Sequence, residues 1–126
     1  MSLGQVSQIH ISVTDVDASV AFYRDVLGIP FLFQVPGQPM AFFQSGGVRL
    51  YLGVPSQPEY TSHNVLYFDV ADIDAERYRL VALGIPVEPP HVVHRDADSE
   101  LWMTFFTDPD GHQLGLSQSR PLTPGT

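Results

Sequence analysis

His10 is the side chain in this sequence best suited to acid–base chemistry. It stands in the alternating run Gln8-Ile9-His10-Ile11-Ser12, where it shares one face of an expected strand with Gln8 and Ser12. An unperturbed imidazole titrates near neutral pH, so a histidine that faces a cavity can serve as a general acid or base. His10 is therefore the candidate catalytic residue. The alternatives are that it only contacts a ligand or that it lines the core.

Other side chains are candidates for ligand contact rather than for catalysis. Tyr51 and Tyr67 each offer an aromatic face and a hydroxyl, which suit a flat or cationic molecule. Trp102 either lines the same cavity or closes the core. These assignments rest mainly on strand parity, and a slip of one residue would invert them. The candidate ligand-binding set is Gln8, His10, Ser12, Arg49, Tyr51, Tyr67 and Trp102.

The composition narrows the classes of function. The chain has no cysteine, which excludes disulfides, thiolate metal sites and a cysteine nucleophile. Six basic residues against 14 acidic ones give a net charge of −8. This charge disfavours binding to nucleic acid and to anionic membranes. If charge contributes to ligand binding, it favours cationic ligands. No apolar run approaches the roughly 20 residues of a membrane span, and no signal peptide opens the chain. We therefore expect a cytoplasmic protein.

The elements that must position these residues follow the order β, α, β, β, β in the first half of the chain. Asp15 is the expected N-cap of a helix whose apolar residues recur at helical spacing until Gly28 supplies a left-handed stop. Three short apolar runs follow, separated by turn signals such as Gly46-Gly47. The expected strands are Ile9–Val13, Phe31–Val35, Met40–Gln44 and Val48–Val54.

The second half of the chain repeats this order. It predicts a strand at Val65–Val70, a helix at Asp72–Leu83 stopped by Gly84, and a strand at Ile85–Val87. Residue types recur as well, in four ordered matches between the halves. In the clearest match, Asp15-Val16-Asp17-Ala18 corresponds to Asp72-Ile73-Asp74-Ala75. In the next, Leu27-Gly28-Ile29-Pro30 corresponds to Leu83-Gly84-Ile85-Pro86. These matches indicate an internal repeat.

The length fits one domain, residues 1–126, made of two such modules. We expect module one at about 6–54, a linker at 55–61, module two at about 62–118 and a frayed tail at 119–126. A module of this size cannot bury its sheet alone, so the two must cover each other or the modules of a second chain. Exposed sheet edges and an open cavity mouth then predict a homodimer.

Three segments together resemble the vicinal oxygen chelate superfamily, which includes glyoxalases, bleomycin resistance proteins and extradiol dioxygenases. They are TDVDASVAFYRDVLGIPF with the strand before it, VADIDAERYRLVALGIPV, and ELWMTFFTDPDGHQLGLSQ. The Phe22-Tyr23 pair and the Asp108-Pro109-Asp110-Gly111 turn are specific in combination. The resemblance covers nearly the whole chain. It implies an α+β fold in which two tandem βαβββ modules form curved mixed sheets around a cup-shaped cavity.

The resemblance also implies that the usual metal site is lost. Metal-using members take four ligands, commonly His or Glu, from matched positions on the first and last strand of each copy. The matching residues here are Gln8, Tyr51, Val65 and Gly115. They offer no carboxylate and no imidazole, whereas catalytic divalent ions need about three such ligands. We predict no cofactor. The alternative is that His10, His63 and Glu100 rebuild a site for Zn, Ni, Mn or Fe.

Three functions remain in competition at this point. The first is a metal-free protein that binds a small aromatic or cationic molecule, as bleomycin resistance members do. The second is an enzyme, either a lyase, isomerase or dioxygenase with an atypical metal ligand set, or a metal-free catalyst that uses His10. The third is an interaction module whose cavity is filled by its own side chains. The family fixes no substrate, because its fold hosts many reactions.

Overall fold

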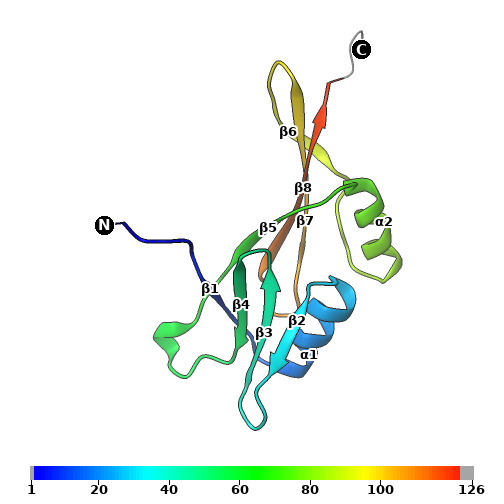
Figure 1. Cartoon of the computed structure of the whole chain (residues 1–126). Coiled ribbons are helices and arrows are strands. Elements are labelled where there is room, and N and C mark those ends of the chain that lie inside the picture. The colour runs from blue at the N-terminus through cyan, green and yellow to red at the C-terminus, as the bar shows by residue number, and fades with distance from the viewer. Residues whose placement is uncertain (1, 123–126) are drawn as a thin grey trace. The chain divides into compact units, whose positions relative to one another are not determined.

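The computed structural model describes residues 2–122 of the chain. The polypeptide divides into two compact units, the first ending at Asn64 and the second beginning at Val65. We call them module one and module two and describe each by itself. Each contains one four-stranded sheet and one main helical segment (Figure 1). No helix within residues 2–122 is long and apolar enough to cross a membrane.

Module one follows the predicted order of elements. Strand β1 (Gln8–Ser12) leads into helix α1 (Val16–Val20), which continues as the π-helical segment η1 (Ala21–Val26). Asp15 is extended and its carboxylate accepts a hydrogen bond from the Ala18 amide, so it caps the helix as predicted. The remaining elements are β2 (Phe31–Gln34), β3 (Met40–Ser45), β4 (Val48–Gly53) and the short 3-10 turn η2 (Pro58–Tyr60).

The π-helical geometry of η1 is a feature that the sequence pattern did not predict. The Leu27 amide donates to the carbonyl of Phe22, five residues back, at 3.0 Å. The prediction assumed the regular helical period throughout, and a π turn, whose hydrogen bonds close five residues apart, departs from it. The segment ends before Gly28, whose φ of 74° is the left-handed stop that was expected.

Module two repeats this order with longer final strands. Its elements are β5 (Val65–Asp69), α2 (Ile73–Ala82), β6 (His91–Arg95), β7 (Ser99–Thr107) and β8 (Gln113–Pro121). Asp72 caps α2 by accepting a hydrogen bond from the Ala75 amide, as Asp15 does for α1. Gly84 follows the helix with a φ of 87°, in the role that Gly28 has in module one.

The two sheets have the same topology, which confirms the predicted α+β fold of two βαβββ modules. The strand order is β1-β4-β3-β2 in one and β5-β8-β7-β6 in the other. In each sheet the first strand of the module pairs in parallel with the last, and the other neighbours are antiparallel. The sheets are therefore mixed, and the repeat seen in the sequence is a repeat of structure.

The strand predicted at Ile85–Val87 is wrong. The chain stays irregular until His91, where β6 begins. Pro89 and Pro90 lie between the two positions and have no amide hydrogen to donate to a neighbouring strand. Val87 is nevertheless buried, and its carbonyl accepts a hydrogen bond from Arg77 Nε at 2.9 Å. Apolar character here reflects packing rather than strand pairing.

Both ends of module two differ from the expected boundaries. Ser62 and Asn64, expected at the start of module two, hydrogen-bond to β1 of module one instead. The prediction of a frayed tail from residue 119 is wrong for Ser119 to Pro121. These residues belong to β8, because they pair with Ser99 to Leu101 of β7. Residues 123–126 of that tail lie outside the described residues.

Candidate functional site

Most of the predicted site residues lie on one face of the module-one sheet. Leu52 and Phe43 are buried on the face that packs against α1 and η1. Because side chains alternate along a strand, Tyr51 and Phe42 lie on the opposite face, which carries no helix. The register places His10 beside Tyr51, and Tyr51 beside Phe42. We call this surface the helix-free face of module one.

Four rings cross this face in a continuous line, which we call the ring row. His10 meets Tyr51 at 4.9 Å between ring centroids, and Tyr51 meets Phe42 at the same distance. Phe42 in turn meets Phe33 at 4.8 Å. Aromatic pairs at such distances contribute about 0.5–1.5 kcal/mol each beyond the area they bury. The row therefore holds its members in place, with neighbouring rings tilted against one another by 33° to 80°.

Gly53 allows the Tyr51 ring to lie along its own strand. A Cβ atom at Gly53 would collide with the Tyr51 ring, whose Cδ1 and Cζ atoms would lie 3.0 Å from it. The ring therefore occupies the space that a larger residue at position 53 would fill. This placement sets Tyr51 between His10 on one side and Phe42 on the other.

A pocket of about 550 Å³ opens beside the ring row. This volume lies within the range of about 300–1,000 Å³ that small-molecule sites occupy. The sheet contributes Gln8, His10, Met40 and Tyr51 to its lining, Pro39 lies just before β3, and η2 contributes Tyr60. Most of the lining surface is apolar, and its polar groups come from β1, from Gln38 and from Ser56.

Ser62 ties one wall of this pocket to β1. The Ser12 amide donates to Ser62 Oγ at 3.0 Å, and the Ser62 amide donates to Ser12 Oγ at 2.8 Å. Asn64 Nδ2 adds a hydrogen bond to the His10 carbonyl at 3.1 Å. The segment that carries Tyr60 is therefore fixed at its end against the strand that carries His10.

His10 is half-buried and held from two sides. Its Nε2 atom lies 3.0 Å from Ser12 Oγ, and its ring is edge-on to Tyr51. These contacts hold the imidazole at the pocket, where it forms part of the lining. Catalysis by His10 stays a prediction.

Arg49 is the charged member of this face. It pairs with Gln8 of β1 and with Gln44 of β3 in the strand register, and its side chain is exposed. Its guanidinium carbon lies over the Phe42 ring, 5.5 Å from the centroid, a cation–π geometry. Arg49 therefore lies beside the middle of the ring row, on the side away from Gly53.

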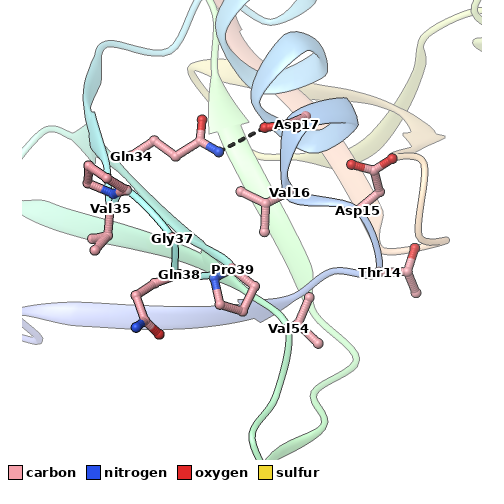
Figure 2. Close-up of a pocket in the computed structure, with 11 residues that line it drawn as sticks. Thr14, Asp15, Val16, Asp17, Gln34, Val35, Gly37, Gln38, Pro39 and Val54 are labelled. Carbon is pink, nitrogen blue, oxygen red and sulfur yellow. Dashed lines mark hydrogen bonds between the residues drawn. The ribbon is translucent and has the colours of Figure 1, made fainter.

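A larger hollow in module one, of about 750 Å³, lies elsewhere and is a weaker candidate. Figure 2 shows it between the start of α1 and the turn after β2. Its two carboxylates already serve the fold, because Asp15 caps α1 and Asp17 accepts a hydrogen bond from Gln34 Nε2 at 2.8 Å. The polar groups here are used for local structure, whereas those beside the ring row border an apolar pocket.

In module two, Tyr67 occupies the helix-free face that matches the one in module one. The register aligns Tyr67 with Gly115 and Gly115 with Phe105. A Cβ atom at Gly115 would lie 2.9 Å from Tyr67 Cδ1 and from Phe105 Cε1. The two rings, with centroids 6.0 Å apart, therefore fill the space above Gly115. Tyr67 remains 58% exposed, so its ring is also available for contact.

Trp102 does not share a face with the other predicted site residues of its module. It alternates with Met103 and lies on the side of Thr104 and Phe106, which are buried. Its ring stacks under the Arg120 guanidinium at 5.2 Å, and Arg120 pairs with Asp74 of α2 at 2.8 Å. Strand parity thus turns Trp102 toward the helix, which favours the alternative that it closes the core. Its assignment to the ligand site stays a prediction.

The residues at the four metal-ligand positions do not fit a divalent ion. Gln8 and Tyr51 offer an amide and a phenol, and Val65 offers no donor and is 54% exposed. At Gly115 the space for a ligand side chain is filled by two rings. Three His, Asp or Glu side chains converge nowhere among residues 2–122. The alternative ligand Glu100 is engaged by Arg95 in an ion pair.

The perturbed titrating groups lie away from the ring row. A hydrogen bond between Arg24 and Asp25, at 2.8 Å, raises the pKa of Arg24 and lowers that of Asp25. The amides of Asp98 and Ser99 donate to Asp96 and lower the pKa of its carboxyl. Both sites lie at the surface, and their hydrogen bonds account for the shifts without any ligand.

Sequence reasoning missed several members of the site. Phe42 and Phe33 complete the ring row, and Met40 and Tyr60 line the pocket. Phe42 was identifiable, because it alternates with the core residues Ala41 and Phe43 in a predicted strand. Phe33 was not, because a bulge between Phe31 and Phe33 shifts the register of β2.

Comparison with known proteins gives one family and several relatives. The model of the family described as "Glyoxalase/Bleomycin resistance protein/Dioxygenase superfamily" matches residues 5–116. Among curated proteins, the chain is 31% identical to "Metallothiol transferase FosB" of Staphylococcus epidermidis, over 88% of this chain and 81% of that protein.

Two solved structures resemble the fold over nearly their whole length. One is TnmS3, described as an antibiotic binding protein from Streptomyces sp. CB03234, with 25% identity, a TM-score of 0.76 and coverage of 95% of this chain and 99% of that one. The other is lactoylglutathione lyase from Agrobacterium tumefaciens, with 25% identity, a TM-score of 0.75 and coverage of 93% and 95%. The relatives thus include both enzymes and a binding protein.

Proposed function

Because this chain belongs to the glyoxalase, bleomycin resistance protein and dioxygenase superfamily, we propose that it binds a small aromatic molecule without a metal ion. The ligand lies on the helix-free face of module one, with its flat part against the ring row and one end in the adjoining pocket. The observation that carries this proposal is the continuous row of four rings that borders a pocket of about 550 Å³.

The chemistry of the face supports an aromatic ligand. Flat apolar molecules gain most from stacking on rings that are already held in place, since little side-chain entropy is then lost on binding. The Tyr51 ring is held between its two ring neighbours and occupies the space over Gly53. The polar side chains of Gln8, His10, Gln38 and Ser56 border the pocket and can orient the ligand.

A metal-dependent enzyme is the second candidate, and the likeness to FosB favours it. That protein is named a metallothiol transferase and covers most of this chain. The donor set argues against the same chemistry here, since Val65 and Gly115 offer no donor and only Gln8 has a side chain that some metal users employ. TnmS3, which is described as an antibiotic binding protein, offers a precedent for binding within the same fold.

The test uses naphthalene-2-carboxamide, an uncharged flat aromatic compound, titrated into chelator-treated protein by calorimetry and by amide NMR. We expect saturable binding that shifts the amides of His10, Tyr51 and Gly53. Tyr51→Ala should weaken this binding about tenfold or more, because it removes the centre of the ring row. The control is Tyr78→Ala, since Tyr78 is 78% exposed on α2 and should leave the affinity unchanged.

Three results would contradict the proposal. They are the absence of saturable binding, binding that Tyr51→Ala leaves intact, and binding that appears only after Mn²⁺ or Zn²⁺ is added. The last result would favour the metal-dependent enzyme instead. A His10→Ala variant that loses turnover of a thiol or diol substrate, with the fold intact, would support catalysis at the same face.

We further propose that the protein is a homodimer. Strand β2 is an edge of its sheet, and its residues Leu32 and Phe33 expose 40% and 45% of their surface. Apolar edges of this kind are commonly covered by a second chain. Light scattering should give a mass of twice 13.9 kDa, and a mass of 13.9 kDa would contradict the dimer.

A further inference from the structure

We propose that Arg49 recognises an acidic group on the ligand, so that the molecule bound on the helix-free face of module one is a small aromatic acid. This inference rests on the proposed function and adds the charge of the ligand to it. It departs from the net charge of −8, which by itself suggests a cationic ligand.

The first argument is the use of arginine in this chain. All six basic residues are arginines, and 14 acidic residues are available to pair with them. Four arginines bind carboxylates, in the pairs Arg24–Asp25, Arg79–Glu76, Arg95–Glu100 and Arg120–Asp74. A fifth, Arg77, donates to the carbonyl of Val87. Among residues 2–122, only Arg49 has a guanidinium with no carboxylate or carbonyl partner.

The second argument is the position of Arg49. Its guanidinium lies over Phe42, a member of the ring row. In the sequence, Arg49 stands two residues before Tyr51 on β4. That separation along a strand is about 7 Å, so the Arg49 side chain and the Tyr51 ring are neighbours on this face. The other residues on this face of β1, β3 and β4 are uncharged apart from the titratable His10.

The third argument is the chemistry of the guanidinium. Its planar set of donors matches a carboxylate with two parallel hydrogen bonds, and such charge-assisted bonds are stronger than neutral ones. The Phe42 ring holds the guanidinium in place before the ligand arrives, which reduces the entropy lost on binding. A cationic ligand in the same position would instead be repelled. The ring row supplies affinity, and Arg49 supplies selection by charge.

The experiment compares three compounds with the same naphthalene ring: naphthalene-2-carboxylate, naphthalene-2-carboxamide and naphthalen-2-ylmethylammonium. Calorimetry on the full chain at pH 7 and low salt should give the tightest binding for the carboxylate, about tenfold tighter than for the amide. Arg49→Gln should remove this preference, so that the carboxylate and the amide bind the variant with affinities within about twofold of each other.

Arg24→Gln is the matched control, because Arg24 lies in the same module and also lies over a ring, that of Phe31 at 5.6 Å. It is paired with Asp25 beside η1, so its loss should leave the carboxylate preference unchanged. Two results would overturn the role of Arg49 and leave the proposed function standing. They are equal binding of the amide and the carboxylate to the wild type, and a preference for the carboxylate that survives in Arg49→Gln. Failure of all three compounds to bind would overturn the proposed function as well.

Discussion

The His10 and Tyr51 rings meet edge to face, with their centroids 4.9 Å apart and their planes at 80°. The contact joins two neighbouring strands, β1 and β4, and forms the pocket end of the ring row. His10, which the sequence indicated for its titratable nitrogen, thus also contributes an aromatic ring to the ring row. The two uses can be separated by substitution.

Replacement of His10 distinguishes the ring from the imidazole nitrogen. His10→Ala should weaken binding of naphthalene-2-carboxamide by about three- to tenfold, because one aromatic pair contributes about 0.5–1.5 kcal/mol. His10→Phe should retain most of the affinity, since it keeps a ring beside Tyr51. Calorimetry on both variants checks this. Equal losses in the two variants would show that the nitrogen, not the ring, contacts the ligand.

Enlarging Gly53 should displace the Tyr51 ring. We expect Gly53→Ala to reduce the free energy of unfolding by about 1–3 kcal/mol, the usual range for overpacking, and to weaken aromatic binding. Urea denaturation and calorimetry measure the two effects. Gly4→Ala is the control, because a Cβ there would meet nothing within 4 Å. A Gly53→Ala protein with unchanged stability and affinity would mean that the Tyr51 ring is not confined as described.

Loss of the Ser62 hydroxyl should loosen the pocket wall. Ser62→Ala removes the acceptor for the Ser12 amide, and we expect a loss of about 1–2 kcal/mol in unfolding free energy together with faster amide exchange at Ser12. Ser7→Ala, at an exposed position just before β1, should change neither quantity. Unchanged exchange at Ser12 in Ser62→Ala would contradict the hydrogen bond between them.

The turn that joins β6 and β7 should depend on pH through Asp96. The amides of Asp98 and Ser99 bond to the ionised carboxylate, so its pKa in the folded protein lies below the ordinary value of 3.8. A depressed pKa means that the stabilisation is present above the unfolded value and is lost as pH falls through the folded one. Carbon-detected NMR titration should show this, and Asp96→Asn should remove it. A pKa at or above 3.8 would contradict the assignment.

The sequence predicted the fold well because the repeated signals are local. Asp15 and Asp72 as caps, and Gly28 and Gly84 as stops, are recognisable from single residues next to apolar periodicity. The strand at Ile85–Val87 failed because an apolar run predicts burial, while the prolines that follow prevent pairing. Local signals define the elements, but they do not show which element pairs with which.

The site was predicted in part, for a related reason. Parity placed His10, Arg49 and Tyr51 on one face, and the register confirms that they share it. Trp102 was left open between the cavity and the core, since a long strand gives no sign of which of its faces the helix covers. The bulge in β2 hid Phe33, and the pocket wall at Tyr60 depends on hydrogen bonds from Ser62 to a strand 50 residues earlier.

The central claim, that this face binds its ligand without a metal ion, is tested most directly by metal retention. Protein purified without chelator would be incubated in turn with Mn²⁺, Zn²⁺, Ni²⁺ and Fe²⁺, desalted, and measured by elemental analysis. Because Gln8, Val65 and Gly115 provide no carboxylate or imidazole, we predict far less than one ion per chain for every metal. Near-stoichiometric retention of any of them would contradict the account and return the protein to the metal-dependent enzymes.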